Sequence, residues 1–313
     1  MIRIMEYRML GKTGLKVSVL SLGASPLGGS FRPIDESEGI RTVRTALDLG
    51  INFIDVSPYY GVTRAESVLG KALREVPRDR YFLSTKVGRY DVDRFDFSAA
   101  RVTSGVDESL KRLGVDFVDL IQCHDIEFGS LDQVVEETLP ALRRVRDQGK
   151  ARFIGITGLP LKIFTEVVGR AEIDTILSYC HYSLNDTTLA SLFSFVQPRG
   201  LGVINASPVS MGLLTQRGAP DWHPAPPAVR EHCARAAAFC REKGVDISQL
   251  AIQFSVRNPA IHTTLVGTAD PEHIRKNVEW LGASLDEELL QEVQSILAPI
   301  KDQTWPSGRP ENN

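Results

Sequence analysis

Short runs of apolar and β-branched residues alternate along the chain with longer stretches in which apolar residues recur at helical spacing. The short runs predict buried strands, and the longer stretches predict amphipathic helices. The predicted strands lie at residues 19–22, 52–56, 81–86, 117–123, 152–156, 175–178, 202–205 and 264–266. The predicted helices lie at residues 36–49, 64–74, 98–113, 131–148, 161–168, 188–195, 228–243 and 271–280. The repeating unit is one strand followed by one helix.

This alternation predicts an α/β protein whose parallel strands close into a (β/α)8 barrel, the TIM-barrel fold. Parallel strands need crossover helices, and closure removes both exposed sheet edges. An open, doubly wound sheet is the alternative architecture. It would bind a dinucleotide through a G-x-G-x-x-G motif after its first strand, whereas segment 23–29 reads GASPLGG. We therefore expect the barrel, with segment 23–29 in a loop at its C-terminal mouth.

Several segments depart from the repeat. Residues 7–17 predict a hairpin that closes the lower end of the barrel. The proline-rich segment 207–227 predicts a long functional loop. Residues 286–297 predict an extra helix, and residues 303–313 predict a polar, frayed tail. We expect residues 1–313 to form a single barrel domain.

Composition narrows the function. The chain has 313 residues, with 36 Lys and Arg against 39 Asp and Glu, so it offers no basic field for nucleic acid. No apolar run approaches the ~18 to 20 residues of a membrane helix, and the N-terminus lacks the apolar core of a signal peptide. We therefore expect a cytoplasmic protein with no membrane partner. Its four cysteines and six histidines show no disulfide framework or metal-ligand spacing.

Candidate chemistry lies where three successive predicted strands end. Asp55 closes the second strand and Tyr60 follows it, Lys86 closes the third, and His124 follows the fourth. Because the carboxyl ends of barrel strands meet at one mouth, we expect these side chains to lie together. A structural salt bridge, mouth packing or a satisfied core histidine explains each residue taken singly. Burying four such residues at one end of adjacent strands costs free energy, so a functional role is the better explanation for the group as a whole.

These residue types make a proton-transfer device. A tyrosine phenol has an ordinary pKa of ~10, and the Lys86 ammonium beside it favours the phenolate while Asp55 holds the lysine charged. Tyr60 then exchanges a proton with a carbonyl or hydroxyl oxygen, and His124 donates a hydrogen bond to the same oxygen.

Segments 55–61, 84–86, 113–120 and 149–155 resemble the aldo-keto reductases in order and spacing, and the resemblance covers essentially the whole chain. It implies a (β/α)8 barrel, a nicotinamide cofactor, a monomer, and a catalytic tetrad of Asp55, Tyr60, Lys86 and His124. Segments 23–28, 124–128, 177–182 and 205–208 are most similar to members that act on aldose sugars. The implied reaction is oxidation of a small-molecule sugar at its anomeric carbon to a lactone, with a hydride passing to the nicotinamide.

The resemblance also implies cofactor contacts from loops after several strands. They fall on Gly23, Ala24, Ser25, Thr157, Tyr179, Ser207, Met211, Leu213, Gly267, Thr268, His273 and Asn277. This chain has Thr157-Gly158 where many members have a serine–asparagine pair, and Ala206 where many stack an aromatic ring on the nicotinamide. Tyr179 is the candidate replacement for that ring; core packing is the alternative.

Charge near the last strand favours NAD over NADP. The family's cationic positions for a 2′-phosphate fall on Gly267 and His273, and nearby Asp270 and Glu272 add negative charge. NADP would still be favoured if Arg275 or Lys276 swung toward the 2′-phosphate.

Past His124, Asp125 and Glu127 are candidates for hydrogen bonds to sugar hydroxyls; a solvated acidic loop is the alternative. Two other functions remain open: an NADPH-dependent general aldehyde reductase, and a non-enzymatic nicotinamide-binding regulatory subunit.

Overall fold

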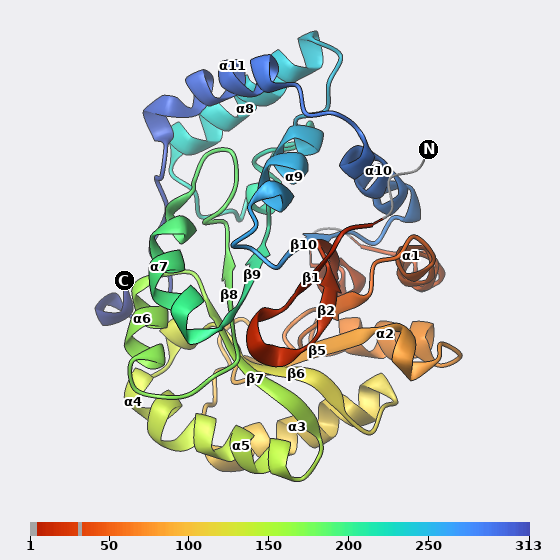
Figure 1. Cartoon of the computed structure of the whole chain (residues 1–313), viewed down its shortest axis with the longest axis vertical. Coiled ribbons are helices and arrows are strands. Elements are labelled where there is room, and N and C mark those ends of the chain that lie inside the picture. The colour runs from red at the N-terminus through yellow and green to blue at the C-terminus, as the bar shows by residue number, and fades with distance from the viewer. Residues whose placement is uncertain (1–4, 31–32) are drawn as a thin grey trace.

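The computed structural model describes residues 5–30 and 33–313, so residues 1–4 and 31–32 of the predicted domain lie outside the described part. Within that part, eight parallel strands close into a barrel in the order β10-β3-β4-β5-β6-β7-β8-β9, with helices around it (Figure 1). The predicted (β/α)8 barrel is confirmed. Its strands are β3 Leu20–Gly23, β4 Phe53–Asp55, β5 Phe82–Val87, β6 Val118–Cys123, β7 Ala151–Gly158, β8 Thr175–Tyr179, β9 Gly202–Ala206 and β10 Thr263–Gly267.

The helices follow the strands in the expected alternation. They are α1 Glu36–Asp48, α2 Arg64–Leu73, α3 Ala99–Leu113, α4 Leu131–Gln133, α5 Leu139–Asp147, α6 Lys162–Val168, α7 Phe193–Val196, α8 Pro227–Glu242, α9 Ile247–Arg257, α10 Pro271–Gly282 and α11 Glu287–Leu297. One turn of π-helix, Val134–Thr138, joins α4 to α5. Local chemistry fixes the helix ends: Asp35, Ser98 and Asp286 cap α1, α3 and α11 with their side chains.

The N-terminal hairpin pairs β1, Tyr7–Met9, with β2, Lys16–Ser18, which confirms that prediction. The hairpin packs Leu10, Leu15 and Val17 against side chains that fill the barrel interior. Gly11 makes this close approach possible, because a Cβ there would lie 2.4 Å from the Gly200 carbonyl oxygen. The hairpin therefore closes the end of the barrel opposite the mouth.

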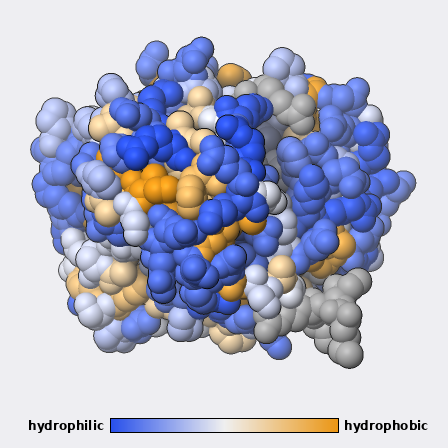
Figure 2. Space-filling view, turned by 90° about the horizontal axis from the view of Figure 1, so that it is seen from above, coloured by the Kyte–Doolittle hydropathy of each residue, from blue (hydrophilic) through white to orange (hydrophobic). Residues whose placement is uncertain are grey.

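The crossover from β9 to β10 differs from the prediction. The predicted helix at 228–243 corresponds to α8, but α8 packs against α11 beyond the barrel, while the unpredicted α9 contacts α10 and β10 (Figure 1). Helix α9 buries Ile247, Leu250, Ala251, Ile252, Gln253, Ser255 and Val256, so its sequence lacks the polar stripe of an amphipathic helix. From above, the α8–α11 side presents a mostly hydrophilic surface with small hydrophobic areas (Figure 2).

The C-terminal tail was predicted to be frayed, but it packs against the rest of the protein. Trp305 is buried and its ring packs edge-on against His223, at 4.9 Å between ring centroids. Asn312 is also buried and donates to the carbonyl oxygens of Glu127 and Gly129, at 2.8 and 3.1 Å. The polar composition that suggested disorder supplies these hydrogen bonds instead.

None of the described helices is long and apolar enough to cross a membrane. Across the described ranges, no group of three or more His, Cys, Asp or Glu side chains is placed to hold a metal ion.

Candidate active site

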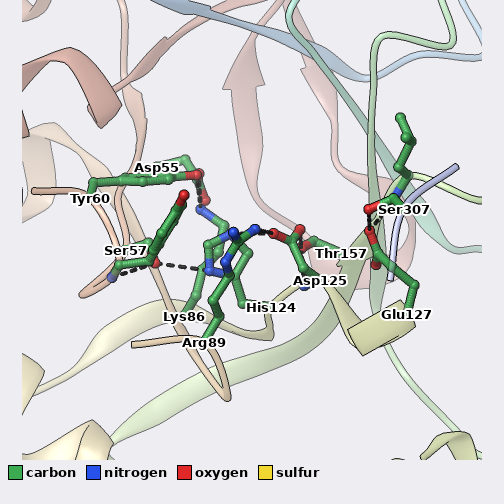
Figure 3. A network of polar contacts seen from close by, with 12 residues as sticks. Asp55, Ser57, Tyr60, Lys86, Arg89, His124, Asp125, Glu127, Thr157 and Ser307 are labelled. Atoms are coloured by element: carbon green, nitrogen blue, oxygen red, sulfur yellow. Dashed lines mark hydrogen bonds and ion pairs between the residues drawn. The ribbon is translucent and has the colours of Figure 1, made fainter. Parts of the chain in front are cut away.

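Side chains that point into the barrel form an apolar layer below and a polar layer above. The apolar layer consists of Phe53, Phe82, Leu120, Phe153, Leu177, Ile204 and Leu265. Because strand side chains alternate, the next inward position on β4, β5 and β6 falls on Asp55, Ser84 and Gln122. Lys86 and His124 follow two residues later, at the mouth. The strand period thus brings Asp55, Lys86 and His124 to one place, and the loop after β4 adds Tyr60 (Figure 3).

Lys86 is the centre of this group. It is 1% exposed, forms an ion pair with Asp55, and donates to the Tyr60 hydroxyl at 3.2 Å and the Val56 carbonyl oxygen at 3.0 Å. Burial lowers the pKa of Lys86, but the charges and hydrogen bonds of Asp55 and Tyr60 outweigh burial and raise that pKa overall. Lys86 is therefore an ammonium ion at neutral pH.

Gln122, which the sequence did not single out, holds Asp55 in place and is itself anchored by Ser84. The Gln122 side-chain amide donates to Asp55 Oδ1 and to Ser84 Oγ, at 2.8 Å in each case. Room for Gln122 comes from Gly155, where a Cβ would lie 2.2 Å from Thr175 Oγ1 and 3.2 Å from Gln122 Cγ. Ser84 and Gln122 could have been found in the sequence, because each lies two residues before Lys86 or His124 and therefore also points into the barrel.

Tyr60 sits on the loop after β4, which packs closely on the loop after β3. A Cβ on Gly61 would lie 2.2 Å from the Gly28 carbonyl oxygen, so glycine is required at this contact. Burial raises the pKa of Tyr60 to about 12, although Lys86 acts in the opposite direction. The sequence argument gave the right sign for Lys86 but omitted burial, which is the larger effect.

His124 is buried and neutral. Its ring lies edge-on to that of Tyr60, with 5.7 Å between centroids and 87° between planes. Its Nδ1 is 3.0 Å from Ser57 Oγ, and its Nε2 is 3.6 Å from Asp125 Oδ2. Burial lowers the pKa of His124 to about 3, and the positive charges of Lys86 and Arg89 act in the same direction. The imidazole is therefore a neutral hydrogen-bonding group at physiological pH.

Asp125 belongs to a buried ion pair rather than a solvated loop. It is 5% exposed and accepts a hydrogen bond from Arg89 Nη1 at 2.6 Å. The Arg89 guanidinium lies 3.9 Å from the ring centroid of Tyr59 and about 5 Å from those of Phe95 and Phe128. Burial raises the pKa of Asp125, but the charge and hydrogen bond of Arg89 act in the opposite direction, and the pKa is lowered overall. Asp125 stays ionised beside His124.

Glu127 is buried under the C-terminal tail. Its side chain has no exposed surface, and its Oε1 accepts from the Leu159 amide at 3.1 Å and from Ser307 Oγ at 2.9 Å (Figure 3). Burial, together with the nearby charge of Asp125, raises the pKa of Glu127 to about 8. Because the carboxyl group faces protein on all sides, the predictions of a sugar contact or a solvated loop at Glu127 are wrong. The residue supports the loop after β6.

Comparison with known proteins bears on this geometry. Residues 19–298 match the model of the aldo/keto reductase family. The chain belongs to the aldo/keto reductase family. It is 52% identical to L-galactose dehydrogenase of Arabidopsis thaliana, over 98% of this chain and 99% of that protein. It is 31% identical to D-arabinose 1-dehydrogenase of Saccharomyces cerevisiae, over 94% and 95% of the two chains.

The structure of an aldo-keto reductase from Bacillus halodurans in its holo form is also similar. The TM-score is 0.79 at 28% sequence identity, covering 97% of this chain and 99% of that one. The observed barrel is therefore the fold of this oxidoreductase family.

The residues predicted to contact the cofactor in this aldo/keto reductase lie mostly at the same mouth. Gly23 and Gly267 pair in register at the ends of β3 and β10, and Tyr179 pairs with Ala206 at the ends of β8 and β9. Ala24, Ser25, Ser207, Met211 and Thr268 follow strand ends, and His273 and Asn277 lie on α10. Leu213 differs, since it is buried in the apolar cluster that contains α8 and α11.

Two further features of the mouth were not predicted from the sequence. Thr157 Oγ1 accepts from the Asp125 amide at 3.0 Å and donates to Asp125 Oδ1 at 3.4 Å. Gly158 leaves room for Glu127, whose Oε2 would lie 2.5 Å from a Cβ at that position. The Thr157-Gly158 pair, which departs from the family pattern, thus fits the acidic residues after β6.

The loop after β9 holds a strained backbone. Ser207, Ser210 and Met211 have φ values of +58°, +47° and +50°. Non-glycine residues rarely adopt this region, and such strain gathers at functional sites. The residue types at these three positions give no sign of the backbone strain.

Proposed function

We propose that the protein oxidises an aldose such as L-galactose at C1 to the corresponding lactone, with NAD as the cofactor. The observation that carries this proposal is the contact of the Tyr60 hydroxyl with the buried Lys86–Asp55 ion pair, beside the neutral ring of His124. The relatives named above, whose names specify L-galactose and D-arabinose as their sugars, support an aldose as substrate.

In the proposed mechanism, Tyr60 accepts the proton of the anomeric hydroxyl. The Lys86 ammonium stabilises the phenolate, and the negative charge of Asp55 keeps Lys86 protonated and fixed. His124 donates a hydrogen bond to the same sugar oxygen and thereby orients C1. NAD, when bound, supplies the acceptor for the hydride that leaves C1. In reduction of an aldehyde, Tyr60 returns its proton to the oxygen.

Small residues at the rim formed by β8, β9, β10 and β3 support a site for a flat ring there. Gly23, Gly267 and Ala206 present no bulky side chain at three adjacent strand ends. A Cβ on Gly267 would come within 3.3 Å of Pro26 and narrow that space. Thr268 and Asn277 are buried polar residues beside it. We propose that these positions, with Tyr179 flanking them, hold the nicotinamide nucleotide.

Contacts at the start of α10 support NAD over NADP. Asp270 accepts from the Glu272 amide at 2.9 Å and so occupies the helix N-terminus with a negative charge. Arg275 pairs with Glu272 at 3.3 Å, and Asp270 lies 3.7 Å from His273. These contacts engage Arg275 and His273, two of the groups that would otherwise be available to a 2′-phosphate.

The test is the initial rate of NADH or NADPH formation with L-galactose, L-fucose, D-arabinose and D-glucose, for the wild type and Tyr60→Phe. We expect NAD-dependent turnover of L-galactose that falls at least about a thousandfold in Tyr60→Phe, because proton transfer is lost. Tyr90→Phe is the matched control, since Tyr90 is a buried tyrosine whose hydroxyl bonds a backbone oxygen.

The other outcomes would replace the proposal. NADPH-dependent aldehyde reduction without sugar oxidation would make the protein a general aldehyde reductase. Tight cofactor binding with no turnover in either direction would favour a regulatory subunit.

A further inference from the structure

We propose that Ser57 is a positioning residue that fixes the tautomer of His124, so that Nδ1 accepts a hydrogen bond and Nε2 carries the proton. The inference rests on the proposed function for its kinetic consequence, but not for the tautomer itself. It begins from the contact of Ser57 Oγ with His124 Nδ1 at 3.0 Å.

A serine hydroxyl can donate or accept, so this contact alone fits either tautomer. The Tyr59 amide resolves the ambiguity, because it donates to Ser57 Oγ at 3.1 Å. Ser57 has no exposed surface, and within the described part of the chain its hydroxyl contacts just these two groups. If Nδ1–H donated to Ser57, the serine proton would be left buried without an acceptor, which is costly. Ser57 therefore donates to Nδ1.

The surroundings of Nε2 lead to the same tautomer by a separate route. Asp125 Oδ2 lies 3.6 Å from Nε2, and Arg89 keeps Asp125 ionised. An unprotonated Nε2 would present its lone pair to this carboxylate, whereas Nε2–H presents its positive end. Burial and the cations Lys86 and Arg89 keep the ring from taking a second proton. The neutral ring thus carries its proton on Nε2.

This arrangement matters for the sugar oxygen, because an imidazole orients that oxygen by donating to it. The donor nitrogen is set by the hydrogen bond at the other nitrogen. Ser57, three residues before Tyr60 on the same loop, couples the placement of the tyrosine to the tautomer of His124. Without the Ser57 hydroxyl, Nδ1 would lose its donor and only Asp125, at 3.6 Å, would favour Nε2–H, so the Nδ1–H tautomer would gain population.

The direct test is ¹⁵N nuclear magnetic resonance of protein labelled on histidine, without substrate. The His124 signals are identified by their loss in His124→Gln. Between pH 5 and pH 9 we expect an unprotonated Nδ1 and a protonated Nε2 in the wild type, and a mixture of tautomers in Ser57→Ala. A protonated Nδ1 in the wild type would overturn the tautomer assignment, and an unchanged spectrum in Ser57→Ala would overturn the role of Ser57.

Kinetics supply a second readout. We expect kcat for sugar oxidation to fall about tenfold in Ser57→Ala with little change in KM for NAD, and to recover in Ser57→Thr, which keeps the hydroxyl. Ser255→Ala is the matched control, because Ser255 is equally buried and donates to the Tyr182 carbonyl oxygen on the outside of the barrel. A kcat in Ser57→Ala equal to that of Ser255→Ala would contradict the positioning role.

The two proposals fail separately. If the spectrum shows the expected tautomer but no aldose is oxidised, the proposed function is wrong and the tautomer assignment stands. If aldoses are oxidised but Nδ1 is protonated, the role of Ser57 is wrong and the proposed function stands.

Discussion

The two halves of the barrel mouth are built in opposite ways. The half formed by β4, β5 and β6 ends in Asp55, Lys86 and His124, all of them buried and tied to neighbours by hydrogen bonds or an ion pair. The half formed by β8, β9, β10 and β3 ends in Tyr179, Ala206, Gly267 and Gly23. Gly267 is exposed, and the loop after Ala206 is strained.

This difference separates two physical demands. Shifting the pKa of an ionisable side chain requires a low dielectric and fixed partners. The half with the tetrad provides both before any ligand arrives. A large flat ligand requires open space, which small residues provide and ionisable ones would obstruct. The barrel meets both demands because adjacent strand ends are independent positions on a rigid frame.

The largest effect expected on the tetrad half is that of Lys86→Met. We expect kcat to fall about a thousandfold, because the Tyr60 phenolate loses its stabilising ammonium. Asp55 would also be left buried and unpaired, so the free energy of unfolding should drop by about 3 to 5 kcal/mol. Initial rates and urea denaturation measure the two losses.

A double variant divides stability from chemistry. Asp55→Asn combined with Lys86→Met removes both charges and should regain most of the free energy of unfolding without regaining activity. If the double variant recovers kcat, the ion pair serves the fold and not the proton transfer.

The pH dependence of sugar oxidation tests the role of burial at Tyr60. Because burial raises the pKa of Tyr60 to about 12, the phenolate that accepts a proton is scarce at neutral pH. The rate of the chemical step should therefore rise by about tenfold per pH unit between pH 6 and pH 9. A substrate deuterated at C1 shows whether this step limits turnover. A flat profile with a full isotope effect would contradict Tyr60 as the base.

Much of this half could be predicted from the sequence, since it depends on local rules. Period-two alternation and the ends of β4, β5 and β6 place Asp55, Lys86 and His124 together without coordinates. The size of each pKa shift could not be predicted, because burial depends on loops packed from elsewhere. Tyr60 shows this: the effect of Lys86 was foreseen and the larger effect of burial was not.

Contacts between distant segments also escaped prediction. Helix α9 is buried on nearly all sides, so its sequence has no amphipathic contrast to mark it. Glu127 meets Ser307 across 180 residues, and nothing in the polar tail signals that partner. Local patterns thus give the elements and their ends, whereas the partners of buried charges require the folded chain.

The contact of Glu127 with the tail gives a prediction for stability. Its pKa of about 8 in the folded state lies above the ordinary 4.5, so the native protein holds a proton that the unfolded chain releases. This contribution is complete below about pH 4.5 and is lost as the pH rises toward 8. Relative to Glu127→Gln, the wild type should lose a few kcal/mol of unfolding free energy between pH 5 and pH 8.

Urea denaturation at the two pH values measures that loss, and taking the difference between variants cancels the other titrating groups. Glu311→Gln is the control on the tail, because the Glu311 side chain is exposed. Parallel pH dependence in the wild type and Glu127→Gln would show that Glu127 ionises normally.

The smallest effect is expected at α10, on the half proposed to bind the cofactor. Glu272→Gln removes the partner of Arg275 while leaving the Asp270 cap intact. The Glu272–Arg275 pair is exposed and worth less than about 1 kcal/mol, so kcat/KM for NADP should rise by about two- to fivefold, with that for NAD unchanged. Glu279→Gln, an exposed change further along α10, separates this effect from general charge. An equal gain in both variants would mean that the field of the helix, rather than Arg275, sets the proposed preference for NAD.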